Sequence, residues 1–301
     1  MDFALRVLSA LLMVALPLAV GVYFSRRWKM SWGLVAIGGA TFLLSQAAHI
    51  PFNTAFLNPI LARLGFGAGA TAGWPLALAA VLLGLSAGVF EEGARFLVYR
   101  FWIRNARTYR QGVTFGLGHG GAEAIAIGIL AILQHAQAFA LQGQDLAAIV
   151  PADQLEAARA QLEAYWSTPA PAFFLSSFER AFALVVQITL SVLVLQAFIR
   201  PRGALWLLAA VGWHALVDAG AVYTGVLWGA YQGLTSGAIA SEVLVGVFAA
   251  ASLLILLRLR PASEPEGSRP GADPPPAMTP PPPDGPAPPE RIDETRYTPA
   301  G

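Results

Sequence analysis

Two adjacent glutamates and an arginine, Glu91, Glu92 and Arg95, interrupt an otherwise apolar stretch of this chain. A charged side chain inside a bilayer costs free energy, and where one occurs it usually serves a function. Neighbouring carboxylates repel one another, whereas a nearby arginine favours the ionised form. A carboxylate held in this way can take a proton from water and return it to a leaving group. On a helix Arg95 lies one turn from Glu91, which predicts that these two residues pair and leave Glu92 free to exchange protons.

Two further pairs of ionisable residues have the same four-residue spacing, His119 with Glu123 and His214 with Asp218. Side chains four residues apart share one face of a helix, and lipid would penalise these faces if they pointed outward. Two chemistries suit the set. The histidines can donate hydrogen bonds to an oxyanion while a glutamate activates water. Alternatively, His119, His214 and Glu123 can hold a zinc ion with an open position for water.

These residues lie at similar depths in their predicted helices. Glu92 stands twelve residues before Arg104, and His214 stands twelve residues after Arg202. Both are therefore about 18 Å from the basic ends of their helices, and the histidine–glutamate pair reaches a comparable depth. We predict that all of them line one water-filled cavity near the middle of the bilayer.

The elements that must position these residues are membrane-spanning helices. Hydrophobic residues make up 56% of the chain and charged residues only 12%, about half the charged share of a soluble domain. Lipid offers no partners for unpaired backbone groups, which excludes isolated strands. Apolar runs of the length that a helix needs to cross a bilayer, about 20 residues, lie approximately at 3–24, 32–50, 74–102, 112–139, 172–199, 203–227 and 239–258. The sequence therefore predicts an all-α polytopic membrane protein. Because the chain has no cysteine, disulfides and thiolate metal sites are excluded.

Basic residues are concentrated in alternate connections between the predicted helices. They follow the first and seventh helices and join the third to the fourth and the fifth to the sixth, whereas the other connections hold only Arg63 and Arg159. The positive-inside rule then places the N-terminus outside and the C-terminus in the cytoplasm of a multi-pass protein of the cell membrane. The net charge of +1 gives no indication of a nucleic-acid partner, so the expected partners are the lipid bilayer and a substrate.

Two segments are expected to lie outside the membrane. The loop 140–170 is acidic and is expected to form a short external amphipathic helix, with a plain solvated connector as the alternative. Residues 1–260 are predicted to form the transmembrane domain. Residues 261–301 are too rich in proline and too poor in apolar side chains to fold, which predicts a disordered cytoplasmic tail.

Several other polar residues have structural interpretations. Glu179 and Arg180 are expected to form an ion pair on the fifth helix. Gln187 is level with the charged residues and either donates a hydrogen bond to them or packs between helices. His49 and Asn53 flank the end of the second helix, where a capping role and an access role are both open.

One serine falls in a motif of hydrolases. Ser86 stands in "GLSAG", which matches the G-x-S-x-G pattern. That pattern works through a strained strand-to-helix turn that exposes the serine, and here it lies within an apolar helix. We therefore do not expect Ser86 to be a nucleophile.

Three motifs occur in a characteristic order along the chain. The strings "EEGAR", "FGLGH" and "HALVD" resemble the EExxxR, FxxxH and HxxxN or HxxxD motifs of the CAAX-protease and bacteriocin-processing superfamily of intramembrane proteases. The longer string "GLGHGGAEA" is similar, more specifically, to the YhfC-type intramembrane proteases. The resemblance covers about residues 88–220. It implies hydrolysis of a peptide bond in a membrane-embedded or membrane-proximal substrate, by a glutamic-type mechanism without a cofactor or by a metal-dependent one with zinc.

The resemblance also implies roles for individual residues. A glutamate activates water, other side chains position that water and bind the oxyanion, and the residues concerned are Glu91, Glu92, Arg95, His119, Glu123, His214 and Asp218. Two departures from the family pattern stand out. Only two residues separate Glu92 from Arg95, which leaves open which glutamate is the base. In addition, Gln187 stands where many such proteins have a histidine.

Two alternative functions come from other classes. Buried glutamate, histidine and aspartate also form proton relays, so a proton- or solute-coupled transporter is one alternative. The other is a non-catalytic binding or immunity protein on the same scaffold.

Overall fold

The computed structural model describes residues 2–66 and 70–261, and every regular element in this part of the chain is a helix. Seven helical segments are long and apolar enough to cross a membrane, which confirms the predicted all-α membrane fold. The helices are α1 (Asp2–Trp28), α2 (Trp32–Phe52), the π-helical turn η1 (Asn53–Leu57), α3 (Asn58–Arg63), α4 (Gly73–Phe101), α5 (Tyr109–Ala140), the short η2 (Leu146–Ala148), α6 (Leu155–Ser167), the short η3 (Ala170–Phe173), α7 (Phe174–Ile199), α8 (Gly203–Gln232) and α9 (Leu234–Leu259). The predicted proline-rich tail lies, from position 262 onward, outside the described residues.

The second membrane segment is longer than the sequence predicted, because the helix does not end at Pro51. The backbone N–H of Asn53 donates to the carbonyls of His49 and Ile50, so the turn after the proline keeps its hydrogen bonds. The chain then continues through η1 into α3 and reaches Arg63. π-Helical turns of this kind often occur at functional sites.

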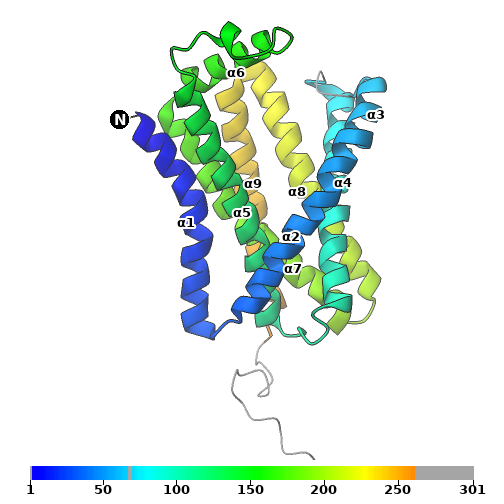
Figure 1. Ribbon diagram of the computed structural model, residues 1–301. Coiled ribbons are helices and arrows are strands. Elements are labelled where there is room, and N and C mark those ends of the chain that lie inside the picture. Colours follow the sequence, from blue (N-terminus) through cyan, green and yellow to red (C-terminus); the bar gives the residue numbers. More distant parts are fainter. Residues whose placement is uncertain (1, 67–69, 262–301) are drawn as a thin grey trace, which may run out of the picture. The chain divides into compact units, whose positions relative to one another are not determined.

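The arginine-bearing connections lie together at one end of the helices. In Figure 1 the α1–α2, α4–α5 and α7–α8 connections are at the bottom of the view, whereas α3 and α6 are at the top. We call the end with these three connections the arginine end, because it carries Arg26, Arg104 and Arg200. The opposite end, with α3 and α6, is called the α6 end. That the arginine end faces the cytoplasm remains a prediction from the positive-inside rule.

Glycines bring the helices that carry the charged residues into backbone contact. A Cβ on Gly84 of α4 would lie 2.5 Å from the carbonyl oxygen of Ala215, and one on Gly88 would lie 2.7 Å from that of Val211. Between α5 and α2, a Cβ on Gly118 would overlap the carbonyl oxygen of Val35. Small residues permit such contacts, which are a main source of helix association in lipid. They hold α4 against α8, and α5 against α2.

An apolar layer fills the space between the buried charges and the arginine end. Tyr99, one turn beyond Arg95 on α4, is fully buried together with Phe115 and Leu195. The ring centroids of Tyr99 and Phe115 lie 4.9 Å apart. Arg107 donates to the carbonyl of Tyr99 at 3.0 Å and covers the layer from the outside. The charged residues are therefore closed off on this side.

The amphipathic helix predicted within residues 140–170 is α6, and it is attached to the N-terminal helix by a buried arginine. Arg6 donates to the carbonyls of Tyr165 at 3.0 Å and Thr168 at 2.8 Å. Its guanidinium carbon also lies 4.5 Å from the ring centroid of Tyr165 and 4.3 Å from that of Phe173. Burial raises the pKa of Tyr165 above its ordinary value, and its hydroxyl lies 3.3 Å from His135 Nδ1.

Candidate active site

The charged residues of the α4 motif form one buried ion-pair group. Arg95 and Glu92 are fully buried, and Glu91 is 6% exposed. Arg95 Nη1 donates a hydrogen bond to Glu92 Oε1, and Arg95 Nη2 lies 3.6 Å from Glu91 Oε2. The prediction that Glu92 stays free of the arginine was therefore wrong. Residues three and four apart on a helix are both neighbours, so the guanidinium fork reaches both carboxylates and has Glu92 as its closer partner.

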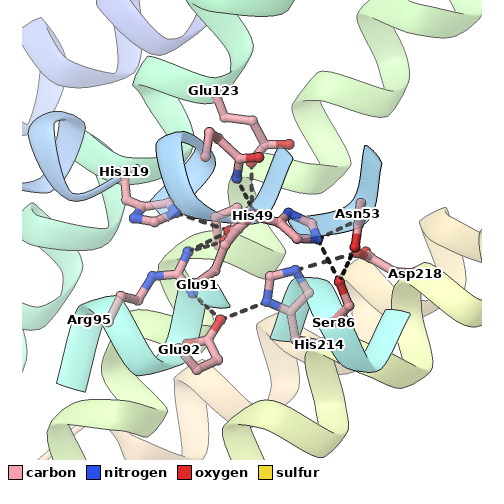
Figure 2. A network of polar contacts seen from close by, with 12 residues as sticks. His49, Asn53, Ser86, Glu91, Glu92, Arg95, His119, Glu123, His214 and Asp218 are labelled. Carbon is pink, nitrogen blue, oxygen red and sulfur yellow. Dashed lines mark hydrogen bonds and ion pairs between the residues drawn. The ribbon is translucent and has the colours of Figure 1, made fainter. Parts of the chain in front are cut away.

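Each glutamate also contacts a histidine from another helix (Figure 2). His119 Nε2 of α5 lies 3.1 Å from Glu91 Oε2, and His214 Nδ1 of α8 lies 2.7 Å from Glu92 Oε1. The second ring nitrogen of His214 is 3.5 Å from Asp218 Oδ2, which is too long for a direct hydrogen bond. Helices α4, α5 and α8 thus bring the predicted side chains into one cluster.

Gln187 of α7 connects this cluster to Glu123. Its Oε1 accepts a hydrogen bond from Arg95 Nη2, while its Nε2 donates to Glu123 Oε2 at 2.7 Å and to Glu91 Oε2 at 3.3 Å. A neutral imidazole has one donor and one acceptor, so a histidine here could not serve these three partners in the same way. The amide is therefore suited to joining a guanidinium to two carboxylates.

Glu123 is held from its other side by Arg180 of α7. Arg180 Nη1 donates to Glu123 Oε1 at 2.6 Å, and Arg180 Nη2 pairs with Glu179. The ion pair predicted for Glu179 and Arg180 exists, and it extends to Glu123. A continuous set of polar contacts therefore runs from α4 to the α6-end half of α7.

A second polar group, which the sequence did not assign to the cluster, comes from α2, from the first residue of η1 and from α4. Gln46 Nε2 donates to Glu91 Oε1 at 2.9 Å. His49 Nε2 lies 2.8 Å from Ser86 Oγ and 2.9 Å from Asn53 Nδ2, and Ser86 Oγ donates to Asn53 Oδ1 at 2.7 Å. Positions 46, 49 and 53 share one helix face. That spacing is the signal that could have identified them.

Ser86 does not have the arrangement of a nucleophilic serine. In such sites a third group orients the histidine through the ring nitrogen that does not face the serine. Here Asn53 and Ser86 both approach His49 through the same nitrogen, Nε2. The group is a polar network and lacks the geometry of a catalytic triad.

The exposure of the site increases from the arginine end toward the α6 end. Glu92, Arg95 and His119 have no exposed surface. The side chain of Glu123 is 16% exposed and that of Asp218 is 39% exposed. Glu123 and Asp218 each lie one turn closer to the α6 end than the histidine on the same helix. The cluster is therefore closed on the arginine-end side of Arg95 and becomes accessible on the α6-end side, at Glu123 and Asp218.

The cluster, as arranged, does not fit a metal ion. Among the described residues, no three histidine, aspartate or glutamate side chains converge in a way that could hold one. His119 and His214 face different glutamates, and Glu123 is bound by Gln187 and Arg180, so the predicted ligand set of His119, His214 and Glu123 does not converge. The guanidinium of Arg95 supplies the positive charge between the two glutamates.

Comparisons with known proteins match most of the membrane domain. A family model described as "YhfC intramembrane metalloprotease" matches residues 12–235, a range that contains every residue of the cluster. The chain is also 32% identical over 264 residues to the "Uncharacterized membrane protein YhfC" of Bacillus subtilis (strain 168), which covers 84% of this chain and 94% of that protein. No solved structure matches the chain significantly.

Proposed function

Because the chain belongs to the YhfC intramembrane metalloprotease family, we propose that it hydrolyses a peptide bond of a membrane-embedded or membrane-proximal substrate. One observation carries the proposal. A carboxylate, Glu91, is held by donors from four helices in a buried site that is open at one end, beside a second carboxylate–histidine pair. Activation of water for attack on a carbonyl requires a general base and hydrogen-bond donors to the oxyanion, and these residues supply both. The location in the cell membrane, with the N-terminus outside, is part of the same proposal.

Glu91 is the general base in this proposal. It keeps a small exposed fraction, and its Oε1 accepts one hydrogen bond from Gln46, which leaves a lone pair for a water molecule. The carboxylate takes a proton from the water as the water oxygen bonds to the carbonyl carbon. The proton then passes from Glu91 to the leaving amine while the C–N bond breaks. Glu92 is fully buried and acts as a positioning residue for Arg95 and His214.

His214 is assigned as the donor to the oxyanion. A carboxylate that binds one ring nitrogen fixes the direction of the other, and Glu92 does this through Nδ1. In the imidazolium form both ring nitrogens are donors, and the carboxylates of Glu92, 2.7 Å from Nδ1, and Asp218, 3.5 Å from Nε2, favour that charged form. The Nε2–H group, 3.5 Å from Asp218, can donate to a substrate oxygen on the open side of the site.

The experiment compares peptides released from membranes that contain the wild-type protein, Glu91→Gln or Glu163→Gln. Glu163 lies exposed on α6, outside the cluster, and serves as the matched control. Mass spectrometry should detect cleavage products with the wild type and with Glu163→Gln, and none of them with Glu91→Gln. Products that persist with Glu91→Gln would contradict the role of Glu91. A wild type without any products would favour the transporter or the non-catalytic binding protein.

The family description includes a metal, whereas water activation by Glu91 does not require one. Metal analysis of the purified protein tests this point directly. Activity that survives chelation agrees with a glutamate mechanism. Stoichiometric zinc that is lost in His214→Ala would overturn it and would mean that the cluster rearranges around a metal.

A further inference from the structure

Beyond Gln46, which donates to Glu91, the polar residues His49 and Asn53 on the same helix face have no role in the hydrolysis described above. Gln46, His49 and Asn53 are all partly exposed. Gln46 donates to Glu91, and one turn farther along the helix His49 and Asn53 form a separate hydrogen-bonded group with Ser86 of α4. Polar side chains at membrane depth are costly unless they face protein, water or a ligand. Four of them in one place indicate a surface that binds something.

This polar face points away from lipid. On the outer side of α2 and α4 an apolar groove is lined by Leu44, Ala48 and Val89, of which Leu44 is 61% exposed and Val89 51% exposed. At 100° per residue, Leu44 lies about 140° from His49 and about 180° from Asn53 around the helix. The side chains of His49 and Asn53 therefore belong to the inner surface that leads to the cluster, which Figure 2 shows from close by.

The hydrogen bonds within the group leave free binding capacity. An asparagine side chain offers two N–H donors and an oxygen with two lone pairs. The Asn53 amide has one donor contact, to His49, and one acceptor contact, from Ser86. A second N–H and a second lone pair remain. Asp218, across the opening on α8, presents a partly exposed carboxylate. Donors and acceptors thus stand side by side, as the N–H and C=O groups of a peptide backbone require.

An extended peptide needs such a surface because its backbone cannot remain unpaired in lipid. The apolar layer of Tyr99 and Phe115 closes the arginine end, so the chain of a substrate can reach Glu91 only from the other side. Resting on the peptidase function proposed above, we infer that His49, Asn53 and Ser86 form a binding subsite for the backbone of an extended peptide segment. That segment enters from the α6 end, the side opposite the basic loops.

The absence of cysteine from the chain allows a test by single-cysteine labelling. The reagent is a membrane-impermeant maleimide, which reacts with a thiolate and therefore requires water around the residue. Asn53→Cys and Asp218→Cys probe the subsite and its opening. Ala48→Cys, next to His49 in sequence but on the groove side, is the control at matched depth. Arg104→Cys reports which face of a vesicle carries the arginine end.

Both subsite cysteines should be labelled from the face opposite the one that labels Arg104→Cys, and Ala48→Cys should be labelled from neither face. Labelling of Asn53→Cys and Asp218→Cys only from the Arg104→Cys face, or from neither face, overturns the inference. The second position keeps the test valid if one variant does not fold. The labelling does not depend on cleavage, so its failure can be told apart from failure of the peptidase function.

A kinetic arm tests the peptide class of the ligand with a substrate recovered in the cleavage experiment. Loss of one hydrogen bond to the backbone in Asn53→Ala should raise KM about two- to tenfold and leave kcat unchanged. A fall in kcat with KM unchanged would mean that the group acts on the reacting atoms and would overturn its role as a subsite.

Discussion

Arg95 is the residue whose removal should have the largest and most informative effect. In Arg95→Leu the fully buried Glu92 loses its cation, Gln187 loses a donor and Glu91 loses an ion-pair partner. Removing one partner of a buried ion pair typically costs about 3–5 kcal/mol, because the remaining charge is left without compensation. We expect a loss of stability of that size, together with a loss of activity.

The contacts of Arg95 predict which second mutation restores stability. Glu92 is hydrogen-bonded to the guanidinium, whereas Glu91 lies 3.6 Å away and has three further donors in Gln46, His119 and Gln187. Adding Glu92→Gln to Arg95→Leu removes the uncompensated charge and should recover most of the lost stability. Adding Glu91→Gln should recover less. Arg95→Lys keeps the charge without the planar fork and should lie between the wild type and Arg95→Leu.

The assay is a double-mutant cycle on the purified protein, with free energies of unfolding measured in mixed micelles. Residues in direct contact typically show coupling energies of about 0.5–3 kcal/mol in such a cycle. The coupling between Arg95 and Glu92 should exceed that between Arg95 and Glu91. A larger coupling to Glu91, or no destabilisation in Arg95→Leu, would refute the account of how the charges are held in the membrane.

Three further predictions concern positions around the site. Gly118→Leu should lower the free energy of unfolding by about 1–3 kcal/mol or prevent folding, because a side chain there meets the Val35 carbonyl. The control Gly93→Ala, at a position with open space around it, should be neutral or stabilising in the same unfolding assay. Gln187→Leu should leave the guanidinium and both carboxylates without their shared amide and reduce the cleavage rate more than the amount of folded protein, and an unchanged rate would contradict its bridging role. Arg6→Ala should increase proteolytic cleavage and hydrogen exchange in residues 144–170 without affecting the cluster, and unchanged protection would show that other contacts attach α6.

The fold was largely predictable, because membrane-spanning helices carry a strong and local signal. A run of apolar residues of sufficient length has few alternatives in lipid. All seven runs correspond to helical segments of the structure. The one clear error of extent, at Pro51, arose because proline is read as a helix end, whereas the η1 turn carries the segment on to Arg63.

The sequence predicted which residues form the candidate site, but it did not predict which of them bind one another. Counting along each helix placed Glu92 and His214 at one depth, and they are in contact. Counting did not show that Arg95 binds Glu92, or that Gln187 joins Arg95 to Glu123. These contacts depend on how each helix is rotated about its axis, which packing between helices decides.

The sequence by itself determined the number of membrane-spanning segments, the end at which the arginines gather and the position of each charged residue along its helix, because these follow from composition and from the rise per residue. Only the tertiary structure decided which carboxylate receives the guanidinium, that Ser86 meets His49 and Asn53, and that the cluster is closed at the arginine end. The physical reason is that glycine contacts such as those of Gly88 and Gly118 set the distance and rotation between helices. A different rotation of these helices would give their polar side chains other partners, although the sequence pattern along each helix would be the same.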